Sequence, residues 1–167
     1  PKDCDILYIN DSKKLSAAKR EELYDIIMEQ AVATGLGTIG PDRIDEINIL
    51  QATYEAMRQA IAQLSPQPDL LLNDAVTIPK VTIPQVPIIK GDAKSISIGA
   101  ASIIAKVTRD RIMTEWHREL PAYAFDIHKG YCTPLHQRHL DANGPCEIHR
   151  WRFENVRRAA ALVRASV

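Results

Sequence analysis

Two aspartates stand at positions where a predicted strand would end. Asp74 follows a run of three leucines, and Asp92 follows Ile-Ile-Lys-Gly. An acid at the end of a buried strand lies at the rim of the sheet, where α/β proteins bind ligands. Two such carboxylates on neighbouring elements could share a divalent cation, because Mg²⁺ prefers oxygen ligands. Asp74 and Asp92 are therefore candidate metal ligands, although Asp is also common in turns and a purely structural role stays open.

Three further segments have residue types that suit contact with nucleic acid. Residues 10–14 (NDSKK) precede a predicted helix and include two cations, which fits a phosphate-contact loop or a solvated helix cap. The turn 91–95 opens a helix and could hold a phosphate with its backbone N–H groups. Residues 128–131 (HKGY) are typical of an exposed loop, in which Tyr131 could stack on a sugar or base.

Three histidines follow that loop, at positions 136, 139 and 149. Their spacing lacks a partnering cysteine pair or an HExxH sequence, so it does not predict a zinc site.

The elements that must position these residues follow from periodicity and from turn signals. Apolar residues at helical spacing, with caps at Ser16 and Thr133, predict helices over 17–31, 45–64, 97–116, 133–143 and 153–164. Short apolar runs predict strands over 32–39, 69–72 and 87–90, the second ending at Asn73-Asp74. This alternation predicts an α/β domain with some parallel pairing.

The overall charge decides little. Lys plus Arg and Asp plus Glu each number 21, so the net charge is zero. Residues 128–167 have a net charge of +4 and residues 1–127 of −4. A basic tail beside an acidic body suits a protein that holds a polyanion next to carboxylates, but it equally suits an Arg-rich solvated helix.

The cysteines and the apolar runs predict the compartment. The three cysteines are far apart and include no CxxC pair, which fits a reducing cytosol. No apolar run in residues 1–167 approaches membrane-spanning length, and these residues contain no recognisable signal peptide, so we predict a cytoplasmic protein with no membrane partner. The chain begins with Pro1, so we expect that the natural start lies upstream.

Five sequence runs together resemble bacterial ribonuclease HII, in the same order and at the expected separations. They cover essentially the whole chain: NDSKKLS (10–16), IDEINILQAT (44–53), IIKGDAKSISIGAASIIAKVTRDR (88–111), HKGYCTPLH (128–136) and IHRWRF (148–153). The resemblance implies a ribonuclease H-like α/β fold, in which a mixed sheet is flanked by helices. It also implies a single domain over residues 1–167, with 128–167 as its helical C-terminal part.

The resemblance also implies an activity. Proteins of this family cleave the RNA strand of RNA–DNA hybrids, and cut 5′ of single ribonucleotides embedded in duplex DNA, with Mg²⁺ or Mn²⁺. The expected partner is therefore an RNA–DNA hybrid or ribonucleotide-containing duplex DNA, and the expected state is a monomer.

The resemblance assigns roles to particular residues. Of the family's four acidic residues, the third matches Asp74 and the fourth matches Asp92. Tyr131 matches the tyrosine that packs on the sugar past the junction. Residues near the substrate backbone would be Asn10, Ser12, Lys13 and Lys90.

This sequence departs from the family pattern at three points. The first two acids lie in an Asp-Glu motif that also supplies a Gly-Arg-Gly segment, which reads the ribose 2′-OH. That motif is not in residues 1–167, and we expect it upstream of Pro1 with the first strand pair of the sheet. Asn73 stands where an aliphatic residue is usual, and would need a hydrogen-bond partner if buried. Cys132 stands where glycine is usual, so that loop could differ in shape.

The missing motif leaves two hypotheses. In the first, the parent protein is a hybrid endonuclease and this span alone is inactive. In the second, the chain is a non-catalytic nucleic-acid-binding module of the same fold. Another ribonuclease H-like nuclease, such as a resolvase, is disfavoured by the GDAKS and HKGY runs.

Overall fold

The structure is a computed structural model that describes residue 9 and residues 15–165. The chain divides into two compact units. The first comprises residues 1–38 and 54–108, and the second comprises residues 39–53 and 109–167.

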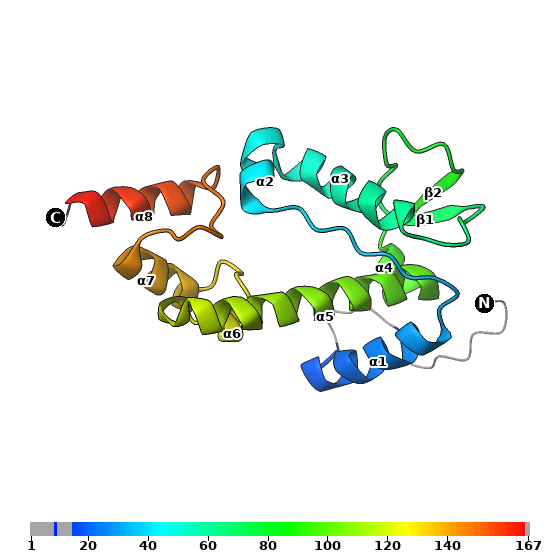
Figure 1. The fold of residues 1–167 in the computed structure, drawn as a ribbon, viewed down its shortest axis with the longest axis horizontal. Helices are drawn as coiled ribbons and strands as arrows, with labels where there is room; N and C mark the ends of the chain where they lie inside the picture. The colour runs from blue at the N-terminus through cyan, green and yellow to red at the C-terminus, as the bar shows by residue number, and fades with distance from the viewer. Residues whose placement is uncertain (1–8, 10–14, 166–167) are drawn as a thin grey trace. The chain divides into compact units, whose positions relative to one another are not determined.

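The first unit contains a two-stranded parallel sheet (Figure 1). Strand β1 (Leu71–Asp74) pairs with β2 (Gln85–Ile88) so that Leu71 lies opposite Gln85 and Asp74 opposite Ile88. The short helix α4 (Gly91–Lys94) follows β2 almost at once. The strands predicted over 69–72 and 87–90 are thus present, the first beginning two residues later and the second two residues earlier than predicted. Their parallel pairing is confirmed.

The core of the first unit lies between two helices. Helix α1 (Ala17–Gln30) begins as predicted at Ser16, whose hydroxyl accepts a hydrogen bond from the Lys19 N–H (3.2 Å). Helix α5 (Ile96–Glu119) begins in this unit and ends in the second. Leu23 and Ile27 of α1 pack against Ile103 and Val107 of α5, all four buried.

The predicted strand over residues 32–39 is wrong, because these residues form no strand. A Cβ at Gly35 or Gly37 would collide with the backbone carbonyl of Ala60 or Ala56, so the segment lies directly on a helix. The Gln63 side chain donates to the Leu36 carbonyl (2.7 Å) and accepts from the Leu36 N–H (3.2 Å). A side-chain amide thereby takes the place of a neighbouring strand, which is why apolar spacing alone was misleading here.

The predicted helix over 45–64 is two helices. Helix α2 (Pro41–Ile47) ends at Asn48, where φ is +70°, and α3 (Ile49–Ala62) begins immediately. The Asn48 carboxamide oxygen accepts hydrogen bonds from the N–H groups of Leu50 (3.0 Å) and Gln51 (3.1 Å). Asn tolerates positive φ and caps helices, so one residue both ends α2 and starts α3.

The second unit is helical beyond α5. The remaining elements are η1 (Pro121–Tyr123), α6 (Phe125–His128), α7 (Pro134–Asn143) and α8 (Glu154–Ala165). The cap predicted at Thr133 is confirmed, because its hydroxyl accepts the His136 N–H (3.2 Å). Leu140 of α7 packs against Val156 and Ala159 of α8, and Met113, Tyr123 and Phe125 form a second cluster.

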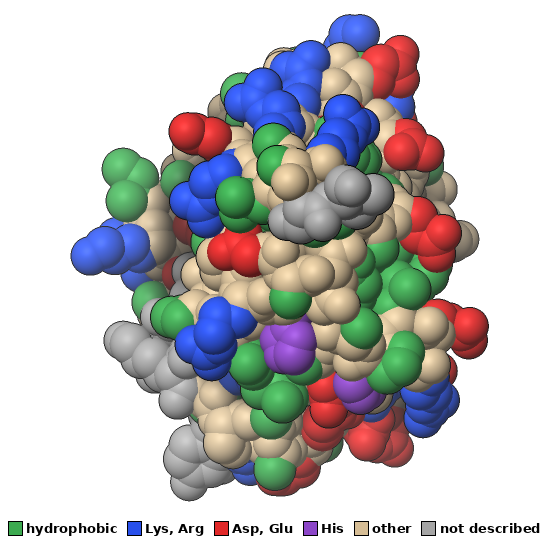
Figure 2. Space-filling view, turned by 90° about the vertical axis from the view of Figure 1, so that its left-hand side faces the viewer, with side chains coloured by type: hydrophobic (Ala, Val, Ile, Leu, Met, Phe, Trp, Pro, Cys, Tyr) green, Lys and Arg blue, Asp and Glu red, His purple; other side chains and the backbone are tan. Residues whose placement is uncertain are grey.

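The surface combines both signs of charge. Basic side chains (Lys or Arg) and acidic side chains (Asp or Glu) both reach the face drawn in Figure 2. Among the described helices, none combines the length and the apolar character that crossing a membrane requires.

Candidate functional site

The two candidate metal ligands lie on neighbouring elements at the carboxyl end of the sheet. Asp74 is the last residue of β1, and Asp92 is the second residue of α4. The Asp74 Oδ1 accepts a hydrogen bond of 2.8 Å from the N–H of Gly91, the residue directly before Asp92. The strand-then-acid pattern therefore placed both aspartates at one edge of the sheet, on neighbouring elements.

Gly91 makes this close approach possible. It is buried, and a Cβ there would meet Ile98 Cδ1 at 2.5 Å and lie 3.4 Å from the Asp74 backbone. Lys90 precedes it with φ at +57°, so the chain turns sharply from β2 into α4. The Gly91 and Ala93 N–H groups donate to Asp74 and to the Lys90 carbonyl, so two of this turn's backbone donors are engaged within the protein.

The donor set suits a hard divalent cation. Mg²⁺ is typically held by one or two protein carboxylates, and its other positions take water and phosphate. Asp74 is exposed and keeps one carboxylate oxygen outside the Gly91 hydrogen bond, and Asp92 is half-buried. Across residues 15–165, no group of three or more His, Cys, Asp or Glu side chains is arranged to hold a metal.

Asn73 finds the partner that its half-buried position demands. Its Nδ2 donates to the Gln85 Oε1 (2.9 Å) on β2, diagonally across the strand pair, since Pro87 is the residue opposite Asn73. The same Gln85 side chain accepts the Ile78 N–H (2.7 Å) and donates to the Ile78 carbonyl (2.9 Å). A polar residue in this strand is thus part of a satisfied network that ties the 75–84 loop to the sheet.

Tyr131 lies on an exposed loop, as expected. Its side chain is 52% exposed, and the Arg109 guanidinium lies 5.9 Å from its ring centroid. Gly130, with φ at +77°, lets the loop pack against Arg109 and Met113. Cys132 causes no backbone strain here, because its φ is not positive. The prediction of an exposed loop is wrong for His128, which is buried at the end of α6.

Three histidines form a buried cluster in the second unit that sequence spacing did not predict. His128, His136 and His149 are each at most 7% exposed, and the Nε2 atoms of His136 and His149 lie 3.1 Å apart. Burial lowers the pKa of His149 to about 4, and burial also lowers the pKa of His136. The rings of His136 and His149 are therefore neutral at pH 7.

An aspartate holds the basic loop that precedes α8. The Asp45 carboxylate accepts the N–H groups of Trp151 (2.7 Å) and Arg152 (2.9 Å). Burial and the neighbouring Arg109 lower the pKa of Arg150, and Asp45 opposes this shift. The Asp45 carboxylate thus stabilises this loop, a role that its sequence pattern did not predict.

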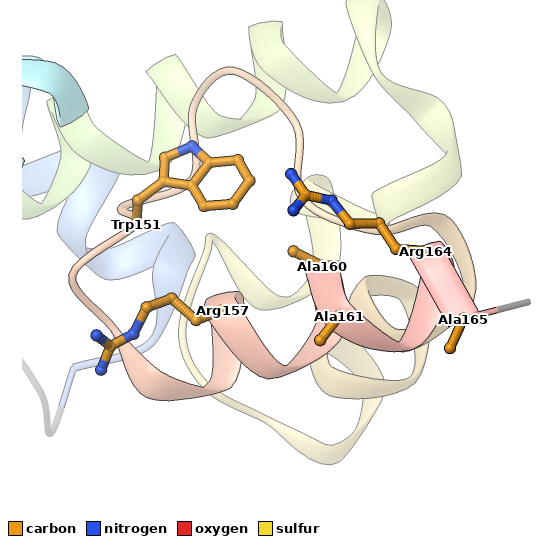
Figure 3. A pocket seen from close by; sticks show the side chains of 6 residues that line it. All are labelled: Trp151, Arg157, Ala160, Ala161, Arg164 and Ala165. Carbon is orange, nitrogen blue, oxygen red and sulfur yellow. The ribbon is translucent and has the colours of Figure 1, made fainter.

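Helix α8 and that loop also line a shallow hollow. Figure 3 labels the six residues that line it, all of which except Trp151 lie on α8: Trp151, Arg157, Ala160, Ala161, Arg164 and Ala165. The predicted substrate-backbone residues Asn10, Ser12 and Lys13 lie outside the described residues.

Comparison with known proteins supports one family. The sequence model described as ribonuclease HII matches residues 5–156. The ribonuclease HII of Lachnoclostridium phytofermentans is 65% identical over 153 residues, which cover 92% of this chain and 60% of that protein. The ribonuclease HII of Bacillus cereus is 55% identical over 157 residues, which cover 94% of this chain and 61% of that protein.

The fold agrees with a solved structure. The crystal structure of ribonuclease H2 from Pyrococcus horikoshii OT3 matches with a TM-score of 0.79 over 94% of this chain and 82% of that one, at 23% sequence identity. The predicted ribonuclease H-like fold is thereby confirmed. The chain spans about 60% of the length of its curated relatives. The match over residues 5–156 and the identities above show that this chain belongs to the ribonuclease HII family.

Proposed function

We propose that the chain is part of an endonuclease that cleaves the RNA strand of RNA–DNA hybrids and cuts 5′ of single ribonucleotides embedded in duplex DNA. The observation that carries the proposal is the approach of Asp74 to the Gly91-Asp92 turn at the carboxyl end of two parallel strands. It occurs in a chain of the ribonuclease HII family, in a position where α/β proteins bind their ligands.

Asp74 and Asp92 are the residues that would hold Mg²⁺ or Mn²⁺. A bound divalent cation would offset the negative charge that develops on the oxygens of a cleaved phosphodiester. The protein's own contribution is orientation. The Gly91 N–H fixes one oxygen of Asp74 and leaves the other for a ligand, and Asp92 directly follows the buried Gly91.

Tyr131 and the arginines near it would contact the substrate. An exposed aromatic ring can stack on a sugar or base, and the guanidinium of Arg109 on one side limits its mobility. Arg109 and Arg150 repel each other electrostatically, so an anion between them would be stabilising. A phosphate group of a nucleic acid supplies such an anion. Asn10, Ser12, Lys13 and Lys90 complete the proposed substrate contacts.

The alternative of a non-catalytic nucleic-acid-binding module has one observation in its favour. Within the described residues, Asp74 and Asp92 have no third carboxylate or histidine arranged with them as a metal site. A module that binds nucleic acid through Tyr131 and the arginines needs no such group. The two functions differ in whether the protein requires the carboxylates of Asp74 and Asp92.

Aspartate substitutions test the proposal. Asp74→Asn and Asp92→Asn are compared with Asp69→Asn, an exposed aspartate just before β1, in the protein as its gene encodes it. The substrate is a DNA duplex with one embedded ribonucleotide, and an all-DNA duplex is the control. Loss of an outer-shell partner of a metal ligand typically costs ~10–100-fold in metal affinity or activity, so loss of a ligand should cost at least as much.

The outcomes separate the two functions. The endonuclease proposal expects cutting that depends on the ribonucleotide, loss of cutting and of Mn²⁺ binding in Asp74→Asn and Asp92→Asn, and near-normal behaviour of Asp69→Asn. A protein that binds the duplex equally well in all four forms and never cuts it would be the binding module.

A further inference from the structure

The buried histidines surround one aromatic ring. The centroids of His128, His136 and His149 lie 5.6, 5.7 and 5.8 Å from that of Phe125. His128 also stacks on His136 at 4.2 Å with an interplanar angle of 11°. Buried histidines must find partners for both ring nitrogens, and these partners define where each proton lies.

The backbone determines the tautomers of the His136–His149 pair. The Cys146 N–H donates to Nδ1 of His149 (3.0 Å), so that nitrogen has no proton and Nε2 has one. His149 Nε2–H therefore donates to Nε2 of His136 (3.1 Å). The remaining proton of neutral His136 lies on Nδ1, which donates to the Tyr131 carbonyl (3.0 Å). A single chain of donors runs from Cys146 to Tyr131.

His128 secures the same loop from its other side. The Gly130 N–H donates to Nδ1 of His128 (3.1 Å), and Nε2–H of His128 donates to the Tyr123 carbonyl (2.7 Å). The Tyr131 N–H in turn donates to the His128 carbonyl (2.9 Å). The buried ring of His128 thus holds the backbone before Tyr131, and the buried ring of His136 holds the carbonyl of Tyr131 itself.

We propose that His136 and His149 are positioning residues that hold Tyr131 in the conformation that contacts nucleic acid, an inference that rests on the proposed function. The chain of donors admits one arrangement of protons. Adding a proton to His136 would set its Nε2–H against the Nε2–H of His149. His149 cannot move its proton to Nδ1, because the Cys146 N–H already donates to that nitrogen (3.0 Å) and the Cys146 Sγ also lies 2.9 Å from it.

The surroundings keep both rings neutral. The titratable groups that face the pair are His128 at the end of α6, His139 on α7, Cys146 in the following loop and Tyr123 in η1, and Glu147 acts on Cys146. None of the groups facing the two rings directly is a carboxylate that would favour imidazolium. The lowered pKa values of His136 and His149 agree with the geometry.

The first test observes the protons directly in the unaltered protein. Long-range ¹H–¹⁵N NMR spectra at pH 7 should show protons on Nε2 of His149, on Nδ1 of His136 and on Nε2 of His128. On acidification, the signals of Tyr131 should shift together with those of the His136–His149 pair. A proton on Nδ1 of His149 at pH 7, or a Tyr131 signal that is indifferent to the pair, would overturn the proposal.

The second test asks whether the pair acts through Tyr131. His136→Leu removes the donor to the Tyr131 carbonyl, whereas His136→Asn retains an N–H near the position of Nδ1 and should rescue. His139→Leu, three residues along α7 and half-exposed, is the matched control. The readout is KM and kcat on the ribonucleotide-containing duplex. We expect His136→Leu to raise KM by up to the ~5- to 150-fold that loss of one stacking contact represents, with a smaller change in kcat.

A double substitution separates the positioning role of His136 from the substrate contact of Tyr131. If His136→Leu acts through Tyr131, it should change KM little further in a Tyr131→Ala background. An equal additional loss in that background would overturn the positioning role and leave the proposed function intact. A Tyr131→Ala protein with unchanged KM would instead remove the substrate role of Tyr131 and, with it, the positioning proposal.

Discussion

The side chain of Tyr131 is the residue whose role can be tested most simply. It is half exposed and is supported through its backbone, so its ring contributes little to the folded core. We predict that Tyr131→Ala weakens hybrid binding by ~1–3 kcal/mol, the usual cost of losing one stacking contact. Its stability should change by less than ~0.5 kcal/mol, as at most surface positions.

Hybrid affinity in Ca²⁺ and urea unfolding measure the two effects of Tyr131→Ala separately. Tyr131→Phe, which retains the ring, should bind nearly as the unaltered protein does. A large loss of stability with normal affinity in the folded fraction would show that Tyr131 is a core residue.

At the residue scale, the sequence predicted what depends on local pattern. The positions of Asp74 and Asp92 at the carboxyl end of the sheet could be predicted, because each follows an apolar run that forms a strand. Their role as metal ligands stays a prediction. The hydrogen-bonded pair of His136 and His149 could not be predicted, because the two residues are 13 positions apart and meet only when α7 and the 144–149 loop pack around Phe125. Asp45 was missed for the same reason, since its partners lie 106 and 107 residues further along the chain.

At the element scale, local signals again determined which predictions held. Ser16 and Thr133 cap their helices through partners three residues away, so both helix starts followed from sequence. Asn48 separates α2 from α3 because its φ is positive. The spacing of apolar residues stays helical through this point and so does not reveal the break. The strand predicted over residues 32–39 was wrong, because Gly35 and Gly37 pack on the surface of helix α3. An apolar pattern does not distinguish that surface from a neighbouring strand.

The two glycines of that segment supply a prediction. Gly37→Ala would place a Cβ against the Ala56 carbonyl, whereas a Cβ at Gly40 meets nothing within 4 Å. We predict that Gly37→Ala costs ~1–3 kcal/mol, because the segment must move off α3 to relieve the overlap. Gly40→Ala should change stability by less than ~0.5 kcal/mol. Urea unfolding of both variants tests this, and equal effects would mean that the segment does not lie on α3.

For the whole molecule, the buried histidines predict the response of stability to acid. The pKa of His149 is about 4 when folded against an ordinary value of 6.5, so between these values the unfolded chain binds a proton that the folded chain does not. Stability is therefore complete above pH ~6.5 and falls as the pH decreases toward 4, with His149 contributing on the order of 3 kcal/mol. The lowered pKa of His136 acts in the same direction.

Urea midpoints at pH 7.5 and pH 5 measure this loss. His149→Gln should be less stable than the unaltered protein at pH 7.5, because the buried pair is broken, but its stability should decline less between the two pH values. An equal decline in both proteins would assign the acid sensitivity to other groups.

The predictions of a single domain, a monomer and a cytoplasmic location stay predictions.

The last prediction concerns residues 1–167 produced by themselves. They contain Asp74 and Asp92 but no Gly-Arg-Gly segment preceded by an Asp-Glu pair. Of their Asp45-Glu46 pair, the Asp45 carboxylate accepts the Trp151 and Arg152 N–H groups and the Glu46 carboxylate pairs with Arg43. We predict that this span cuts a ribonucleotide-containing duplex weakly or not at all, because the cation would have too few carboxylates. Its affinity for the duplex should depend little on the 2′-OH, since the group proposed to read it is absent.

The same span should also tend to aggregate. Leu72, Val86 and Ile89 are 38%, 43% and 72% exposed on or beside the sheet, and β1 and β2 each have one neighbouring strand within the described residues. Exposed apolar strands with open edges are prone to pair with other chains. The measurement compares residues 1–167 with a version that adds an Asp-Glu/Gly-Arg-Gly segment and its strand pair, by light scattering and by cutting in Mg²⁺ or Mn²⁺. Strong cutting by the short form that depends on the 2′-OH would show that other residues, such as Asp110 or Asp126, complete the site.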